Sequence, residues 1–230
     1  LAWGRLRYGK LHVSDADGAV LPATLSARGK TLTLTFDATH ARYPVIVDPL
    51  VWLQQEVSAS NGVRGDNFGY SVALSTNGTT ALVGAWEKTV GGNSRQGAAY
   101  VYTLTNGTWS QAAYLRASDG AAYDYFGGSV ALSATGATAL VGAHGKNTNQ
   151  GTAYVYTRPS GGWVSTSAFA AELSALGGAA SNYFGDSVAL SANGTVALVG
   201  AYGKTVSGNT SQGAAYMYTK PSGGWVSTSA

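Results

Sequence analysis

The sequence has no cysteine among its 230 residues, which excludes disulfide bonds, thiolate nucleophiles and cysteine-ligated metal ions. Charge is scarce as well, because only 11% of the residues are Asp, Glu, Lys or Arg. Soluble domains usually carry roughly 25%. The net charge of +3 is thinly spread, without the basic cluster that displaces counterions from nucleic acid. We therefore expect no nucleic-acid partner.

Long apolar runs are missing too. No segment approaches the roughly 18 apolar residues of a membrane helix, so we predict no membrane span. The chain starts with Leu1 rather than methionine, and we expect it to be a piece of a longer protein. Its composition instead contains 32 glycines and 14 tyrosines, with much serine, threonine and alanine. Such a mixture is typical of short strands joined by tight turns.

One segment recurs three times. Phe68, Phe126 and Phe184 lie at equal intervals of 58 residues, within "NFGYSVALSTNGTTALVGAWEK", "YFGGSVALSATGATALVGAHGK" and "YFGDSVALSANGTVALVGAYGK". Each copy reads as four strands: "SVALS", "ALVGA", a tyrosine-rich "AYVYT" and a fourth strand opened by a tryptophan. Both faces of these strands are apolar or small, so each sheet must pack between similar sheets. The expected fold is all-β, built of β-propeller blades, with a solenoid as the alternative.

The chain is predicted to have two parts. Residues 1–51 form a small N-terminal β segment, and residues 52–230 hold the repeats. The repeat units run over Trp52–Thr108, Trp109–Gly162 and Trp163–Gly224, and a fourth begins at Trp225. Three blades do not close a ring, since propellers have at least about four. We expect self-assembly, or completion of the ring by other chains.

A possible catalytic serine is Ser187, because "GDS" around it resembles the signature of an esterase family. The preceding residue, however, is Tyr70, Gly128 or Asp186 in the three copies, while the serine stays the same. A nucleophile is needed once, together with its base and its oxyanion donors. The repeated serine is therefore interpreted as structural, and the protein as not an enzyme.

The elements "FGxSVALS", "ALVGA" and "GAAYVYT" resemble those of bacterial FG-GAP repeats, which are related to the propeller repeats of integrin α chains. The resemblance covers residues 52–230. It implies a propeller in a secreted or cell-surface protein with a role in binding or adhesion. Calcium-binding copies of that family carry an aspartate-rich loop, but here the loops read "STNGTT", "SATGAT" and "SANGTV". We therefore expect no calcium and no other cofactor. Asp66 and Asp124, replaced by Asn182 in the third copy, are expected to accept backbone hydrogen bonds rather than bind metal.

A candidate ligand site follows the second strand of each copy. The residue after "VGA" is aromatic or histidine, and a lysine stands two residues later; these residues are Trp86, His144, Tyr202, Lys88, Lys146 and Lys204. Rings with nearby donors suit sugars or acidic peptide groups. The alternative is that the rings pack between blades and the lysine stems cover them.

Three functions fit these patterns. The first is a noncatalytic extracellular module for adhesion or protein–protein contact. The second is a lectin-like propeller that binds a glycan through the aromatic residues. The third is a structural subunit of a surface filament or layer, in which neighbouring chains complete incomplete rings.

Overall fold

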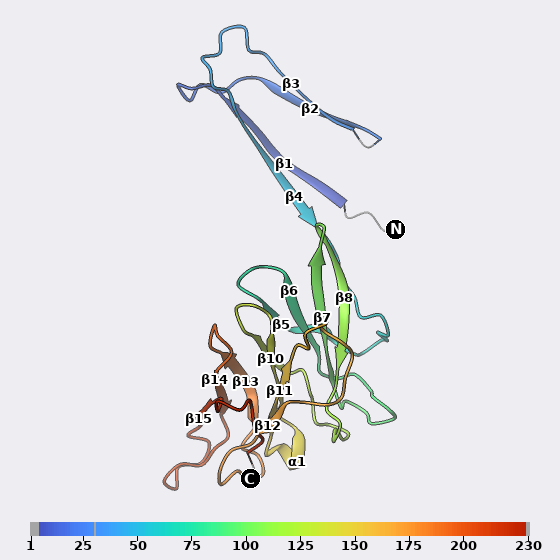
Figure 1. Cartoon of the computed structure of the whole chain (residues 1–230), viewed down its shortest axis with the longest axis vertical. Helices are drawn as coiled ribbons and strands as arrows, with labels where there is room; N and C mark the ends of the chain where they lie inside the picture. The colour runs from blue at the N-terminus through green and yellow to red at the C-terminus, as the bar shows by residue number, and fades with distance from the viewer. Residues whose placement is uncertain (1–4, 30, 229–230) are drawn as a thin grey trace. The chain divides into compact units, whose positions relative to one another are not determined.

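The computed structural model describes residues 5–29 and 31–228, and they are almost entirely strands and turns (Figure 1). The chain divides into two compact units, Leu1–Glu56 and Val57–Ala230. The only helix in the described part is α1 (Lys146–Asn149), a single turn. No described helix is long and apolar enough to cross a membrane.

The first unit consists of two antiparallel strand pairs. β1 (Arg5–Ser14) pairs with β4 (Ile46–Gln54), and β2 (Ala23–Arg28) forms a hairpin with β3 (Thr31–Phe36). The predicted boundary between residues 51 and 52 falls inside β4. Trp52 was expected to open the outer strand of a blade, but its strand pairs with β1, where Trp52 lies opposite Arg7. In the described part of the chain no blade precedes this strand, so its backbone pairs with the edge of β1.

The second unit contains three antiparallel sheets, which we call blades 1, 2 and 3. In each blade the strands lie side by side in chain order. Blade 1 consists of β5 (Phe68–Leu74), β6 (Thr80–Ala85), β7 (Ala98–Thr105) and β8 (Thr108–Leu115). Blade 2 consists of β9 (Ser129–Leu132), β10 (Thr138–Ala143), β11 (Thr152–Thr157) and β12 (Ala171–Leu173). Blade 3, as far as the structure describes it, has β13 (Phe184–Leu190), β14 (Val196–Ala201) and β15 (Ala214–Thr219).

The fourth strand differs between blades. In blade 1 it begins beside Trp109, as predicted, because Asn106 and Gly107 form a two-residue turn with positive φ at both positions. In blade 2 the prediction was wrong, since Trp163 lies outside any strand and β12 starts eight residues later. The turn before Trp163 contains Pro159, which has no N–H to pair and is part of a wider loop. Trp163 instead packs in the core, and its Nε1 donates to Gly136 O at 2.9 Å.

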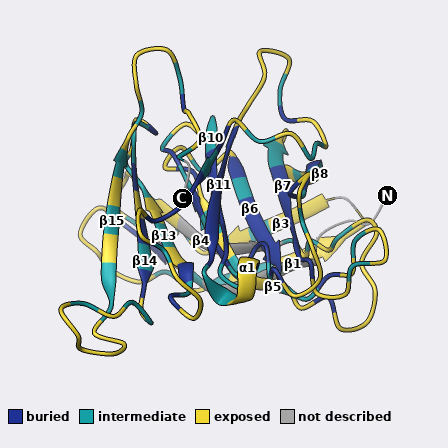
Figure 2. Cartoon of the chain, turned by 90° about the horizontal axis from the view of Figure 1, so that it is seen from below, coloured by how far each residue is buried: buried dark blue, intermediate teal, exposed yellow. Residues whose placement is uncertain are grey.

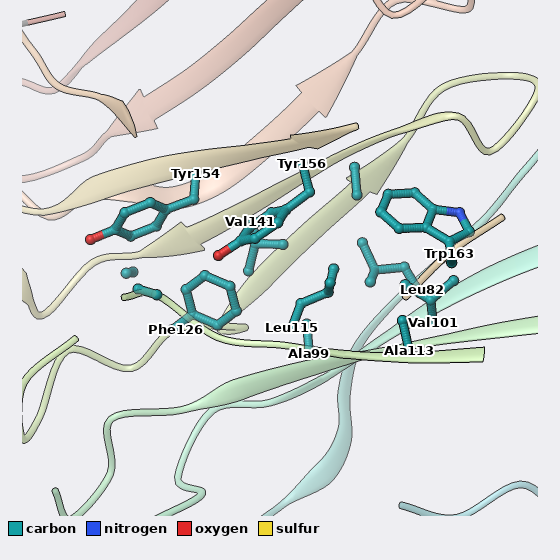
Figure 3. Packing of buried hydrophobic residues seen from close by; sticks show 13 residues of the cluster. Leu82, Ala99, Val101, Ala113, Leu115, Phe126, Val141, Tyr154, Tyr156 and Trp163 are labelled. Atoms are coloured by element: carbon teal, nitrogen blue, oxygen red, sulfur yellow. The ribbon is translucent and has the colours of Figure 1, made fainter. Parts of the chain in front are cut away.

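Two apolar cores hold the blades face to face. Between blades 1 and 2, Phe126 and Leu115 lie across from Tyr154 and Tyr156 (Figure 3). At the other end of this core, Leu82 and Val101 lie beside Trp163. The second core lies between blades 2 and 3 and is centred on residues that are essentially inaccessible; these include Leu140, Val155, Phe184 and Val199. Figure 2 shows the consequence, because β10 and β11 are mostly buried whereas β15 carries exposed residues. The prediction that sheets of this composition must be covered on both faces is confirmed for blade 2.

The tyrosine hydroxyls of the third strand complete each core. Tyr102 donates to Ser58 O at 2.7 Å, Tyr156 to Arg116 O at 2.8 Å and Tyr218 to Ser174 O at 2.8 Å. Each acceptor lies in the segment just before the blade, so the same bond occurs at the same place in all three repeats. Burial raises the pKa of Tyr102 and of Tyr218 to about 12, which keeps both hydroxyls protonated as donors.

Candidate functional site

One continuous row of rings crosses all three blades, and we call it the rim row. Each blade contributes the residue that follows its second strand, stacked on a tyrosine from its own first strand or from the turn before that strand. Trp86 stacks on Tyr70 with ring centroids 4.6 Å apart. His144 stacks on Tyr125 at 5.2 Å, with only 12° between the planes. In blade 3 the pair is Tyr183 and Tyr202, at 4.8 Å and 9°.

The same rings also meet across the blade junctions. Trp86 of blade 1 lies 5.0 Å from Tyr125 of blade 2, and His144 of blade 2 lies 6.4 Å from Tyr183 of blade 3. The rings therefore pack between blades, which was the alternative interpretation of the sequence. Each inner ring of the row therefore contacts at least two neighbouring rings, whereas Tyr70 and Tyr202 at the two ends each contact only one of the described rings.

Three tyrosines on or beside the rim row are well exposed: Tyr70 at 59%, Tyr123 at 53% and Tyr202 at 55%. Tyr123 contacts Tyr125 edge-on at 6.3 Å, and the guanidinium of Arg95 lies 6.0 Å from its ring. The indole Nε1 of Trp86 is buried and has no hydrogen-bond partner in the described part of the chain. The accessible tyrosines are thus held by ring contacts: Tyr70 and Tyr202 by stacking, and Tyr123 by its edge-on contact with Tyr125.

His144 is the one titratable imidazole in the row. Burial lowers its pKa, and the Asp186 carboxylate, 3.9 Å from Nδ1, opposes that shift. Since the net direction is downward, His144 is neutral at physiological pH and stacks as an uncharged ring.

The three predicted lysines point away from the rim row. Lys88 Nζ lies 2.8 Å from Asp66 Oδ2, and both side chains are buried. Lys146 Nζ lies 2.8 Å from Asp119 Oδ2. Lys204 Nζ donates to Gly177 O at 2.6 Å. Their ammonium groups are already bonded inside the repeats, so the solvent-facing part of the predicted site is aromatic.

The repeated aspartates have the hydrogen bonds that we predicted. Val63 N donates to Asp66 Oδ2 and Ala121 N to Asp124 Oδ2, both at 2.8 Å. Burial raises the pKa of Asp124, although the Ala121 N–H and Lys146 act against that shift. In the third copy Asn182 is buried, and its Nδ2 has no partner within the described residues. Among the side chains that the structure describes, no three His, Asp or Glu residues are grouped to hold a metal ion.

The serine that recurs in each repeat joins one blade to the next. Ser71 Oγ donates to Gly127 O of blade 2, and Ser129 Oγ to Gly185 O of blade 3, each at 2.7 Å. The contact leaves no room for a side chain on the adjacent strand, because a Cβ on Gly142 would overlap the oxygens of both Gly185 and Ser129. The serine–glycine contact, which we call the clamp, gives Ser71 and Ser129 a structural role.

The phenylalanine–glycine pair provides the rest of the junction. Phe126 N donates to Gln96 O at 2.8 Å, and Phe184 N to Gln150 O at 3.0 Å, each across a blade boundary. Tyr125 and Tyr183, which precede these phenylalanines, are rim residues that we did not predict, and so is Tyr70. The signal was present, since a tyrosine stands directly before the phenylalanine in two of the three copies.

The same segments match a family model. The model described as FG-GAP repeat matches residues 52–102, 109–156 and 168–218, which is more than half of the chain. The chain belongs to the FG-GAP repeat family. The three FG-GAP matches include most of blades 1, 2 and 3, and each contains its phenylalanine–glycine pair.

Other comparisons add little to the FG-GAP assignment. No curated protein matches the chain. Among solved structures, the chain is similar to TolB from Acinetobacter baumannii, with 14% identity and a TM-score of 0.33. That alignment covers 90% of this chain and 48% of the TolB chain, so the chain spans about half the length of that protein.

Proposed function

We propose that this FG-GAP chain is a noncatalytic binding module of a secreted or cell-surface protein, and that it binds a protein ligand through the rim row. The observation that carries the proposal is the alignment of exposed Tyr70, Tyr123 and Tyr202 along rings that stacking holds fixed. Tyrosine is enriched in protein interfaces because it offers a large amphipathic surface at a low entropy cost. A prearranged row loses little further freedom on binding.

The bonding partners of the repeated serines and aspartates support a noncatalytic role. The repeated serines in the two complete junctions donate to backbone carbonyls rather than to a base. The buried carboxylate of Asp66 is paired with a lysine, and that of Asp124 accepts a backbone N–H. We likewise propose that the module works without a cofactor.

The extracellular placement rests on the resemblance of the repeats to those of integrin α chains. The absence of cysteine is compatible with it but does not require it. Adhesion is the role that this resemblance favours, and the rim row supplies the surface on which a partner protein can rest.

The proposal is tested by binding the purified chain to an array of immobilised collagen, laminin and fibronectin, with a glycan array in parallel. We expect binding to at least one of the proteins. Tyr123→Ala and Tyr202→Ala each weaken it by about tenfold or more, as for residues that carry much of an interface's energy.

Tyr43→Ala is the matched control, because Tyr43 is 75% exposed but belongs to the first unit. It should leave the affinity unchanged. Binding to none of these proteins, or equal losses in all three variants, would remove the rim row as the ligand surface.

A glycan is the second candidate, because the two end rings each have a neighbour on only one side. Tyr70 stacks on Trp86 and Tyr202 on Tyr183, so each has a face on which a sugar ring can stack. Binding to the glycan array but not to the protein array, lost in Tyr202→Ala, would favour this function.

The third candidate, a subunit that assembles with other chains, is favoured by a separate observation. The outward faces of blades 1 and 3 expose positions that are buried between blades. Completion of the ring by further blades remains part of our proposal, and these faces indicate how it would occur.

A further inference from the structure

The outer face of blade 3 exposes residues that the other blades bury. Leu82 and Leu140 occupy the same position in β6 and β10, and both are completely inaccessible, whereas Leu198 in β14 is 42% exposed. On the neighbouring strand Met217 is 78% exposed. Its counterparts in blades 1 and 2 are completely buried; they are Val101 and Val155. What covers this face in blades 1 and 2 is the next blade along the chain.

The outer face of blade 1 shows the reverse pattern. Val72 and Leu74 of β5 are 69% and 60% exposed. Their counterparts in β9 and β13 pack against the core shared with the preceding blade; they are Val130, Leu132, Val188 and Leu190. The covering partner at these positions is the preceding blade.

The backbone groups of the junction are also left open on blade 3. Arg95 and Gln96 accept N–H bonds from blade 2, and their counterparts in blade 3 are Ser211 and Gln212. These two residues line a hollow of about 590 Å³ together with Ser187, Gly200 and Tyr202. Ser187 is the clamp serine of this blade, and the hollow is where the next phenylalanine–glycine pair would lie. We call this hollow the socket.

Blade 1 carries the matching part. Gly69 has φ +91°, close to the +88° of Gly127 and the +87° of Gly185. The two later glycines fit tightly against the preceding blade, whereas no atom lies within 4 Å of a Cβ built on Gly69. Gly127 and its neighbours insert into blade 1. Phe68, Gly69 and Val72 are the equivalent residues of blade 1. We call these three residues the plug.

We propose that the plug of one chain docks into the socket of a second copy of the same chain. The chain builds this junction twice internally, and within the described residues one half is left unpaired on blade 1 and the other on blade 3. The contact joins unlike faces, and such a contact leads to a closed ring or an open filament according to the rotation between subunits. This inference deepens the assembly part of the proposed function and does not depend on ligand binding by the rim row.

The rim row supports the same pairing. In blade 1 the residue before the phenylalanine is Asn67 instead of tyrosine, and Tyr70 takes the in-blade place beside Trp86. In blade 2 the in-blade tyrosine also contacts the ring of the preceding blade. At the copy-to-copy junction Tyr70 would therefore meet the exposed ring of Tyr202, and the row would continue from one chain into the next.

The structure offers one substitution that blocks each half. A Cβ on Gly200 would press only on Ser187 Oγ at close range, and this hydroxyl can rotate within the free chain. In the docked pair the same Cβ would also overlap the carbonyl of Gly69, as it does at the two internal junctions. Val72→Lys places a charge at a position that is solvent-exposed in the free chain but would be buried by docking.

Sedimentation equilibrium on the purified 230-residue chain tests the proposal. Wild type should associate as its concentration rises to the order of 100 µM, a range in which weak complexes form. Gly200→Ala and Val72→Lys should each weaken association by at least about tenfold. Val20→Lys is the matched control, since Val20 is 67% exposed in the first unit, and it should associate like wild type.

Mixing the two blocked variants tests the head-to-tail geometry. Val72→Lys retains an intact socket and Gly200→Ala an intact plug, so an equimolar mixture should form a 1:1 dimer and nothing larger. A wild-type chain that stays monomeric throughout would overturn the proposal. Association that both variants leave intact, or a mixture that fails to form the dimer, would overturn it as well. No ligand is present, so this result is separate from that of the binding arrays.

Discussion

Replacing Gly142 with alanine should weaken the junction between blades 2 and 3. A Cβ there falls well under 3.0 Å from Gly185 O, which is backbone of the next blade and cannot rotate away. Overpacking of this kind costs about 1–3 kcal/mol. Losing the bond from Ser129 Oγ to Gly185 O removes about 1 kcal/mol more. Alanine loses less backbone entropy than glycine when the strand forms, and this offsets about 0.5–1 kcal/mol of the destabilisation. The net loss in free energy of unfolding is therefore about 1–3.5 kcal/mol.

Gly200→Ala is the matched control, because Gly200 holds the same repeat position without a following blade in the described chain. Only Ser187 Oγ lies close to the added methyl group, so stability should change by less than about 1 kcal/mol. Urea unfolding at low micromolar concentration, followed by near-UV circular dichroism, compares the two variants with wild type. Equal losses in both would refute the packing of glycine against the next blade.

Three further predictions follow from the same contacts. Asn182→Asp gives the third repeat the carboxylate that the first two possess, at the position where Asp66 and Asp124 lie beside Lys88 and Lys146, and should raise stability in urea by about 0.5–1.5 kcal/mol; a loss would contradict it. The pKa of His144 is lowered below the usual value of about 6.5 in the folded chain, so the unfolded chain takes up a proton at this residue at a higher pH than the folded chain does. The free energy of unfolding should therefore fall as pH drops from about 7.5 to about 5. His144→Tyr should reduce that slope, and an unchanged slope would count against it. Ser129→Ala should cost about 1 kcal/mol because it breaks the clamp, whereas Ser187→Ala should cost almost nothing in the free chain; thermal unfolding distinguishes them.

The repeated residues made the blades predictable from the sequence. Phe126 with its following glycine, and the serine two positions beyond that glycine, recur because each junction needs the same insertion and the same clamp. The apolar character of both sheet faces then required stacked sheets. The sequence could not show which blade each side chain contacts, because the three repeats carry nearly the same residues and therefore do not reveal the direction of stacking.

The lysines show where the sequence pattern was insufficient. Lys88 stands two residues after Trp86, a spacing that suggested one common site. A turn, in which Lys88 N donates to Ala85 O at 3.1 Å, intervenes and directs the amine toward Asp66 and the ring toward the rim. The start of β12 was also missed, because it depends on the loop around Pro159 rather than on Trp163.

Amide hydrogen exchange tests the central claim most directly. The N–H groups of Phe126 and Phe184 bond across blade junctions, whereas the equivalent group of Phe68 faces no blade in the described chain. In the Gly200→Ala variant, where a second copy cannot dock, Phe126 and Phe184 should exchange at least about 100-fold more slowly than Phe68, because their exchange requires the blades to open. Equal exchange at all three positions would contradict the stacking of blades through these junctions.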